Sequence, residues 1–216
     1  MAPFIGISRH RMATDGKGVT TLAAFYGCPL NCAYCLNPHC KSKDTSPKYY
    51  SPQTLYNEVR IDELYFLATS GGITFGGGEP ALYSSFIATF REFCGPNWNI
   101  NLETSFNVPL KNIQELYPVI NHYIIDIKDI NNDIYHKYTG ITNEKTIENL
   151  RWLVNQGAVD KITVRIPRIP EYNTEEDIQK SVDFIQQLGI TDLDVFEYTR
   201  KLEKREAREK RLEKRD

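Results

Sequence analysis

The chain has 216 residues, of which 41% are hydrophobic and 25% are charged, and its formal net charge is −2. This balance fits one globular domain with a sizeable core and excludes a disordered or fibrous protein. The small net charge predicts no nucleic-acid binding, and no apolar run approaches the roughly 18 residues of a membrane span. Because residues 1–6 do not form a secretory signal, we expect a cytoplasmic protein without structural disulfides.

The first predicted strand, residues 19–26, leads into a loop that reads G-C-P-L-N-C-A-Y-C-L-N-P-H-C, residues 27–40. Three cysteines in this loop follow the spacing C-x3-C-x2-C, namely Cys28, Cys32 and Cys35. Three thiolates on one short loop need a common partner. On an iron–sulfur cubane, three protein ligands leave one iron open for a substrate or cofactor.

A zinc site is the alternative for the same loop. His39 or Cys40 would supply a fourth donor and close a tetrahedral zinc centre. Such a centre would make the protein a non-catalytic zinc-binding module, and the loop alone does not decide between the two metals.

Helical and strand patterns alternate along the rest of the chain. The expected helices are 51–68, which can break near Arg60, 83–93, 111–117, 145–156 and 174–188. The expected strands after the first are 73–75, 99–104, 123–127, 161–166 and 193–198. Alternation of this kind predicts an α/β fold with a parallel sheet and outer helices. Six strands are too few for a closed eight-stranded barrel, so we expect an open, curved partial barrel.

Two predicted strand ends carry residues suited to binding a ligand. After strand 73–75 comes G-G-G-E-P, residues 76–80, whose glycines let the backbone approach a ligand and whose Glu79 offers a carboxylate to an ammonium group. At the end of strand 123–127, alternation places Asp126 and Lys128 on one side. This pair suits a ribose hydroxyl and a carboxylate, or it forms a local ion pair.

Two further strands carry polar residues where apolar ones are expected. Glu103 and Thr104 end one strand, and Arg165 interrupts the apolar strand 161–166. A charge inside such a strand needs a partner, which a carboxylate ligand or Glu103 would supply.

The last segment, residues 200–216, differs in composition from the rest of the chain. It is dominated by Lys, Arg and Glu at helical spacing and cannot build a core. We therefore expect a core domain over residues 1–199 and a charged C-terminal helix over residues 200–216.

Together these motifs resemble the glycyl-radical-enzyme activating enzymes of the radical S-adenosylmethionine (SAM) superfamily, of the pyruvate formate-lyase activase type. The resemblance covers roughly residues 10 to 198. It rests on the cysteine loop, S-G-G-I-T-F-G-G-G-E-P, L-E-T-S and I-I-D-I-K, with D-G-K-G before them and H-K-Y-T-G after them.

The resemblance implies roles for individual residues. Cys28, Cys32 and Cys35 would ligate a [4Fe–4S] cluster, and Tyr34 would border the SAM adenine. The remaining SAM contacts would come from Gly77, Gly78, Glu79, Glu103, Thr104, Asp126 and Lys128, to which we add Arg165. Asp15 would lie near the substrate peptide, and no side chain is expected to act as a general acid or base.

The activity implied is an oxidoreductase reaction. Reductive cleavage of SAM would give a 5′-deoxyadenosyl radical, which would abstract hydrogen from a glycine of a partner glycyl-radical enzyme or peptide. A low-potential donor of the flavodoxin or ferredoxin type would supply the electron. An alternative within the same superfamily is an enzyme acting on a small molecule, similar to 7-carboxy-7-deazaguanine synthase.

Overall fold

A computed structural model describes residues 1–12 and 14–198. The strands are β1 (Ala2–Met12), β2 (Val19–Phe25), β3 (Lys48–Tyr50), β4 (Gly72–Gly77), β5 (Asn99–Thr104), β6 (His122–Asp126), β7 (Ile162–Arg168) and β8 (Leu193–Glu197). The α-helices are α1 (Pro52–Val59), α2 (Glu63–Thr69), α3 (Ser84–Cys94), α4 (Leu110–Leu116), α5 (Asn132–Thr139), α6 (Glu144–Asn155) and α7 (Glu175–Gln187). Short 3-10 turns are η1 (Pro38–Cys40), η2 (Arg60–Asp62), η3 (Pro80–Tyr83) and η4 (Val159–Lys161).

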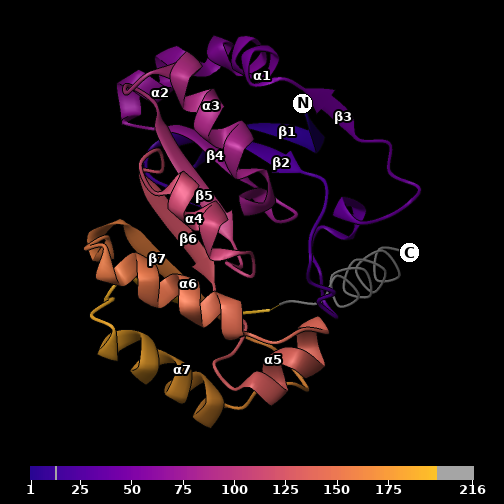
Figure 1. Ribbon diagram of the computed structural model, residues 1–216, viewed down its shortest axis with the longest axis vertical. Helices are drawn as coiled ribbons and strands as arrows, with labels where there is room; N and C mark the ends of the chain where they lie inside the picture. Colours follow the sequence, from indigo (N-terminus) through magenta and orange to yellow (C-terminus); the bar gives the residue numbers. More distant parts are fainter. Residues whose placement is uncertain (13, 199–216) are drawn as a thin grey trace, which may run out of the picture.

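All eight strands form one sheet in the order β3-β1-β2-β4-β5-β6-β7-β8. The pairs from β2 to β8 are parallel, and β1 is antiparallel to both β2 and β3. The sheet is curved (Figure 1), and its two end strands, β3 and β8, are not paired with each other. The expected open, parallel α/β sheet with six parallel strands is therefore confirmed.

The two antiparallel strands were not predicted from the sequence. Along β1 only Ala2 and Phe4 are buried, and the remaining residues are partly or fully exposed. A strand with so few buried residues has no strong alternation of apolar and polar positions, so its pairing with β2 and β3 is what identifies it.

The helices follow the predicted pattern with one addition. The expected helix 51–68 begins with Ser51 as its N-cap, accepting a hydrogen bond from the Thr54 N–H at 3.1 Å, and it breaks at Arg60 as expected. The unpredicted helix is α5, which begins after Asn131 and ends at Gly140 in a left-handed conformation.

Helices α1, α3, α4 and α6 pack side by side along one face of the sheet (Figure 1). Their apolar sides and the strands enclose a core that includes fully buried Trp98, Phe75 and Phe90. This layer leaves the carboxyl ends of the parallel strands free to carry polar side chains.

In the part of the chain that the structure describes, no helix is long and apolar enough to cross a membrane. The charged segment expected to form a C-terminal helix, residues 200–216, lies outside the described residues.

Candidate active site

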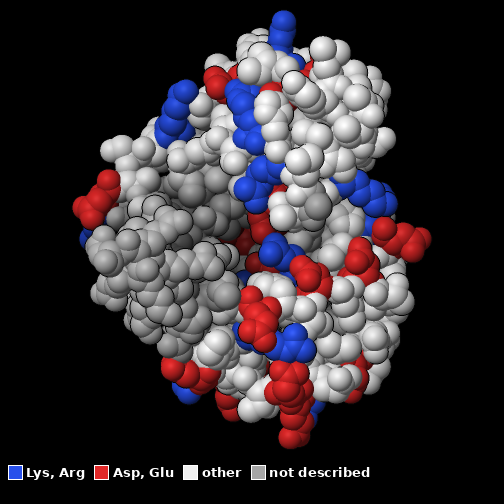
Figure 2. Space-filling model, turned by 180° about the vertical axis from the view of Figure 1, so that it is seen from behind, with Lys and Arg blue, Asp and Glu red and all other residues white. Residues whose placement is uncertain are grey.

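A polar pocket lies where the parallel strands end. It is lined by the loop after β2, the ends of β4, β5 and β6, Arg165 within β7 and residues at the end of β8. The lining residues are Cys28, Leu30, Cys32, Cys35, Leu36, Asn37, Gly77, Gly78, Glu79, Glu103, Thr104, Ser105, Asp126, Lys128, Arg165, Phe196 and Tyr198. Figure 2 shows a hollow on one face of the molecule at which acidic and basic side chains gather.

The cysteine loop is joined to the glycine-rich end of β4 by backbone contacts. The Gly78 N–H donates to the Phe25 carbonyl at 3.0 Å, and the Glu79 N–H donates to the Gly27 carbonyl at 2.8 Å. A Cβ atom on Gly78 would lie 2.1 Å from the Gly27 oxygen, so only glycine permits this approach. The loop closes on itself where the Gly27 N–H donates to the Cys40 carbonyl at 2.6 Å.

The three pocket thiols differ in their electrostatic surroundings. Burial raises the pKa of Cys28 to about 12 and also raises the pKa of Cys32. A hydrogen bond with Cys40 lowers the pKa of Cys35 and raises that of Cys40, which is buried. Cys40, which had no assigned role from the sequence, therefore stabilises the thiolate of Cys35.

The chemistry of the donor set fits an iron–sulfur cluster. Among residues 1–12 and 14–198, no three His, Cys, Asp or Glu side chains converge closely enough to hold one ion. In a cubane each thiolate bonds a different iron, and three thiols that line one pocket are compatible with this arrangement.

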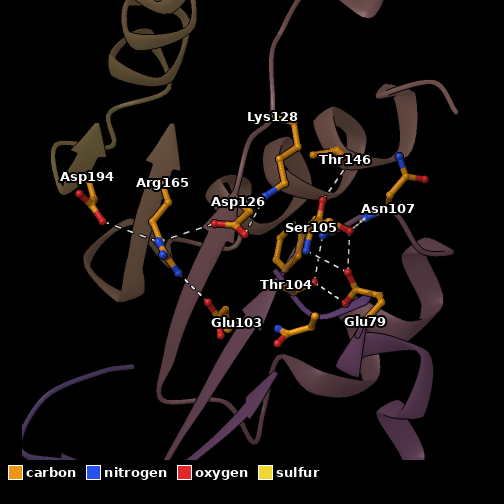
Figure 3. A network of polar contacts seen from close by, with 12 residues as sticks. Glu79, Glu103, Thr104, Ser105, Asn107, Asp126, Lys128, Thr146, Arg165 and Asp194 are labelled. Carbon is orange, nitrogen blue, oxygen red and sulfur yellow. Dashed lines mark hydrogen bonds and ion pairs between the residues drawn. The ribbon is translucent and has the colours of Figure 1, made fainter. Parts of the chain in front are cut away.

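Glu79 joins the ends of β4 and β5 through a complete set of hydrogen bonds (Figure 3). One oxygen accepts from the Thr104 hydroxyl at 2.5 Å and the Ala81 N–H at 3.1 Å. The other accepts from the Ser105 hydroxyl at 2.6 Å and the Ser105 N–H at 2.9 Å. Burial raises the pKa of Glu79, and these donors oppose the rise. Four donors occupy the acceptor sites of one carboxylate, so Glu79 is already satisfied by the protein.

Charges of both signs meet on the neighbouring strands (Figure 3). Lys128 donates to Asp126 at 3.0 Å, and Arg165 contacts Glu103 at 2.6 Å and Asp194 at 3.6 Å. Burial works against the charge on Lys128, but Asp126 together with Cys32 and Tyr198 outweighs it, so the pKa of the ammonium is raised. Glu103 is the carboxylate partner that Arg165 was expected to need.

Asp126 retains capacity to bind a further donor. Its Oδ1 atom is buried and accepts no hydrogen bond from the described residues, and the Arg165 guanidinium lies 3.7 Å from it. Lys128 likewise has three donor hydrogens and makes only the bond to Asp126 in this part of the chain. An acceptor and a donor with spare capacity at the pocket wall suit a polar ligand that carries both hydroxyl and carboxylate groups.

Two residues expected in the site do not line the pocket. Tyr34 lies beside it, in ring contact with Tyr138, Tyr172 and Tyr198, and its hydroxyl donates to Glu171 at 3.0 Å. Asp15 is buried and paired with Arg11. Its backbone carbonyl accepts from Thr74 and Asn101. All other predicted site residues are brought together at the pocket.

Six lining residues were not predicted, and three of them lie at strand ends. Ser105 comes directly after β5, and Phe196 and Tyr198 lie at the end of β8. Polar and aromatic residues near the carboxyl end of a parallel strand were the sequence signal that could have identified these three lining residues. Leu30, Leu36 and Asn37 belong to the cysteine loop, where no sequence pattern distinguishes inward from outward side chains.

Comparison with protein families gives a match to the model described as the Radical SAM superfamily, over residues 23–185. Among curated relatives, the (2S)-3-sulfopropanediol dehydratase activating enzyme of Klebsiella oxytoca is 36% identical over 145 residues, which cover 66% of this chain and 45% of the relative. The pyruvate formate-lyase 1-activating enzyme of Escherichia coli (strain K12) is 28% identical over 183 residues, covering 81% of this chain and 72% of the relative.

Solved structures share the fold at low sequence identity. Streptococcus suis SuiB bound to S-adenosylmethionine has a TM-score of 0.63 and 17% identity, over 81% of this chain and 39% of that one. The structure of anSMEcpe with bound AdoMet has a TM-score of 0.58 and 14% identity, over 81% of this chain and 48% of that one.

Proposed function

This chain belongs to the radical SAM superfamily and is an enzyme of that type, and from this membership we propose that it activates a glycyl-radical enzyme. It would do so by cleaving SAM reductively and abstracting hydrogen from a glycine of the partner. The observation that carries the proposal is that three loop cysteines and polar residues of the parallel strands line one pocket. Two curated relatives named as activating enzymes support the choice of a glycine as the hydrogen source.

Within this proposal, Cys28, Cys32 and Cys35 hold a [4Fe–4S] cluster. When bound, the cluster and SAM supply one-electron chemistry that breaks a carbon–sulfur bond and makes a carbon-centred radical available for hydrogen abstraction. The superfamily implies both groups.

The remaining pocket residues orient SAM. The free lone pairs of Asp126 Oδ1 suit a ribose hydroxyl, and the spare donors of Lys128 suit the methionine carboxylate. Because Glu79 is saturated by protein donors, the backbone carbonyls of Gly77 and Gly78 are the better acceptors for the methionine ammonium. The polar side of the pocket next to SAM is completed by Glu103, Thr104 and Arg165. Tyr34 borders the adenine, although it is not one of the residues that line the pocket.

We extend the proposal to the setting of the reaction. Residues 1–199 form the radical SAM core domain, Asp15 lies on the side where the substrate peptide enters, and the enzyme works in the cytoplasm. A flavodoxin or ferredoxin supplies the electron, because SAM cleavage requires an external reductant.

The experiment is electron paramagnetic resonance of a candidate glycyl-radical enzyme incubated anaerobically with this protein, SAM and a reductant. We expect a glycyl-radical signal that disappears when the acceptor glycine of the partner is replaced by alanine. SAM cleavage without a glycyl radical in any candidate, together with Mg²⁺-dependent turnover of a pterin-like compound, would instead favour the small-molecule enzyme.

A further inference from the structure

Lys41 directly follows the cysteine loop in the sequence, and its side chain contacts the beginning of that loop. Its ammonium donates to the Leu30 carbonyl at 2.5 Å and to the Asn31 side-chain oxygen at 2.9 Å. Both acceptors lie between Cys28 and Cys32, so this half-buried side chain bridges the loop from its end to its beginning.

The same segment is held from its other side by helix α5. The Asn31 N–H donates to the Thr139 carbonyl at 2.7 Å, and the Ala33 N–H donates to the Tyr138 carbonyl at 3.0 Å. Cys32 is thus carried by a short stretch with anchors on both sides, and Lys41 is the anchor that brings a charge.

The charge of Lys41 is not neutralised by contact. Its two acceptors are neutral groups, and across residues 1–12 and 14–198 it forms no ion pair with a carboxylate. Lys128, the other lysine near the thiols, is paired with Asp126. Lys41 is near enough to Cys28 and Cys32 for its charge to act on both thiols.

We propose that the Lys41 ammonium fixes the segment Leu30–Ala33 and raises the reduction potential of the cluster held by Cys28, Cys32 and Cys35. Reduction adds one electron from the external donor, and an unneutralised positive charge nearby stabilises the more negative form. The inference rests on the proposed function only in requiring that the loop binds a cluster.

The test compares Lys41→Gln, which keeps an N–H donor without the charge, with Lys41→Arg, which keeps the charge. The matched control is Lys43→Gln, because Lys43 is exposed and makes no hydrogen bond or ion pair in the described part of the chain. Each protein is reconstituted anaerobically, its iron and sulfide are measured, and the midpoint potential of the cluster is titrated without SAM or a partner enzyme.

We expect the midpoint potential of Lys41→Gln to shift to more negative values, while Lys41→Arg and Lys43→Gln match the wild type. We also expect chelators to remove iron faster from Lys41→Gln. If Lys41→Gln cannot retain iron but Lys41→Arg can, a cation is required at this position, which supports the part of the inference that Lys41 fixes the segment Leu30–Ala33.

Two results would overturn the inference. One is a fully loaded Lys41→Gln protein with the potential of Lys43→Gln, and the other is loss of the cluster from Lys41→Arg as well. A wild-type protein that binds no cluster refutes both the proposed function and this inference. A wild-type cluster with the expected shifts but no glycyl radical in any partner refutes the proposed function alone.

Discussion

At the residue scale, the carboxylate of Glu79 shows how one pocket residue is held. Its four donors come from the turn after β4 and the end of β5, and its exposed fraction is 1%. Glu79→Gln has nearly the same shape as the wild type. Its NH₂ group, however, would replace an oxygen that accepts hydrogen bonds and would face N–H and O–H donors. Leaving a buried polar group unpaired costs about 1–3 kcal/mol.

We therefore expect Glu79→Gln to lower the free energy of unfolding by about 1–3 kcal/mol in urea titrations. Glu115→Gln is the control, since Glu115 is exposed and accepts only from Ser84 in the described residues. Equal stability of the two variants would show that the Glu79 network contributes nothing to the fold.

The sequence predicted site residues correctly where a charged side chain lies in or directly after an apolar strand. Asp126, Lys128 and Arg165 are conspicuous because each is a charge in or beside an apolar strand. The sequence did not reveal that Glu79 is saturated by donors or that Tyr34 lies outside the lining. These facts depend on side-chain directions that only the folded loop determines.

Asp129, in the segment after β6, makes the stability of the protein depend on pH. This residue is 1% exposed and accepts from the Asn131 N–H at 2.8 Å and from the Asn173 side chain at 3.4 Å. Burial, which outweighs these hydrogen bonds, raises the pKa of Asp129 to about 6. In the unfolded chain the pKa is about 3.9.

Because the folded-state pKa is the higher one, the contribution of Asp129 to stability is fully present below about pH 4 and is lost as the pH rises through about 6. The loss amounts to roughly 3 kcal/mol, since a tenfold change in proton affinity is worth about 1.4 kcal/mol. Asp129→Asn cannot ionise, so we expect its stability relative to wild type to increase between pH 4.5 and 7.5, measured by urea unfolding.

Asp160→Asn, at an exposed site, is the control. A difference between wild type and Asp129→Asn that stays constant with pH would contradict this account.

At the element scale, the cysteine loop and the end of β4 meet through the backbone of Gly78. Gly78→Ala places a Cβ atom 2.1 Å from the Gly27 oxygen and 2.9 Å from its carbonyl carbon. Because both are backbone atoms, the loop must move. Overpacking of this kind costs about 1–3 kcal/mol or more.

For Gly78→Ala we expect a loss of stability at the upper end of that range and a lower iron content after reconstitution. Gly6→Ala on β1 is the matched control, since its Cβ would meet no atom within 4 Å. If Gly78→Ala binds as much iron as Gly6→Ala, the contact does not position the loop.

A helix or strand could be predicted from the sequence where its buried residues follow a regular pattern. Strands β4 to β7 and helices α3 and α6 have such patterns. Strand β1 was missed because most of it is not buried, and β3 because it has only three residues. Helix α5 was missed although Asn131 and Gly140 flank it with typical cap residues, so its caps were the unused signal.

At the scale of the whole molecule, one hydrophobic core connects the described residues. The core runs from Ala2 to Ile190, and β8 closes the pocket with Phe196 and Tyr198. Truncation after Tyr198 removes the charged segment 200–216 and none of these contacts.

We expect the truncated protein to fold and to bind as much iron as the full chain, measured by thermal unfolding and iron analysis. Truncation after Gly189 is the control, because it also removes β8 and its pocket residues. Loss of folding on the first truncation would show that residues 200–216 are part of the structural core.

The central claim is that the three-cysteine pocket supports reductive cleavage of SAM, and the most direct measurement is the amount of 5′-deoxyadenosine formed. The wild-type protein is reconstituted anaerobically, reduced and given SAM, with Cys32→Ala treated in parallel. We predict a brown wild-type protein with about four irons per chain that forms 5′-deoxyadenosine and methionine, and a Cys32→Ala protein that does neither. A colourless wild-type protein with one zinc per chain and no 5′-deoxyadenosine would contradict the account.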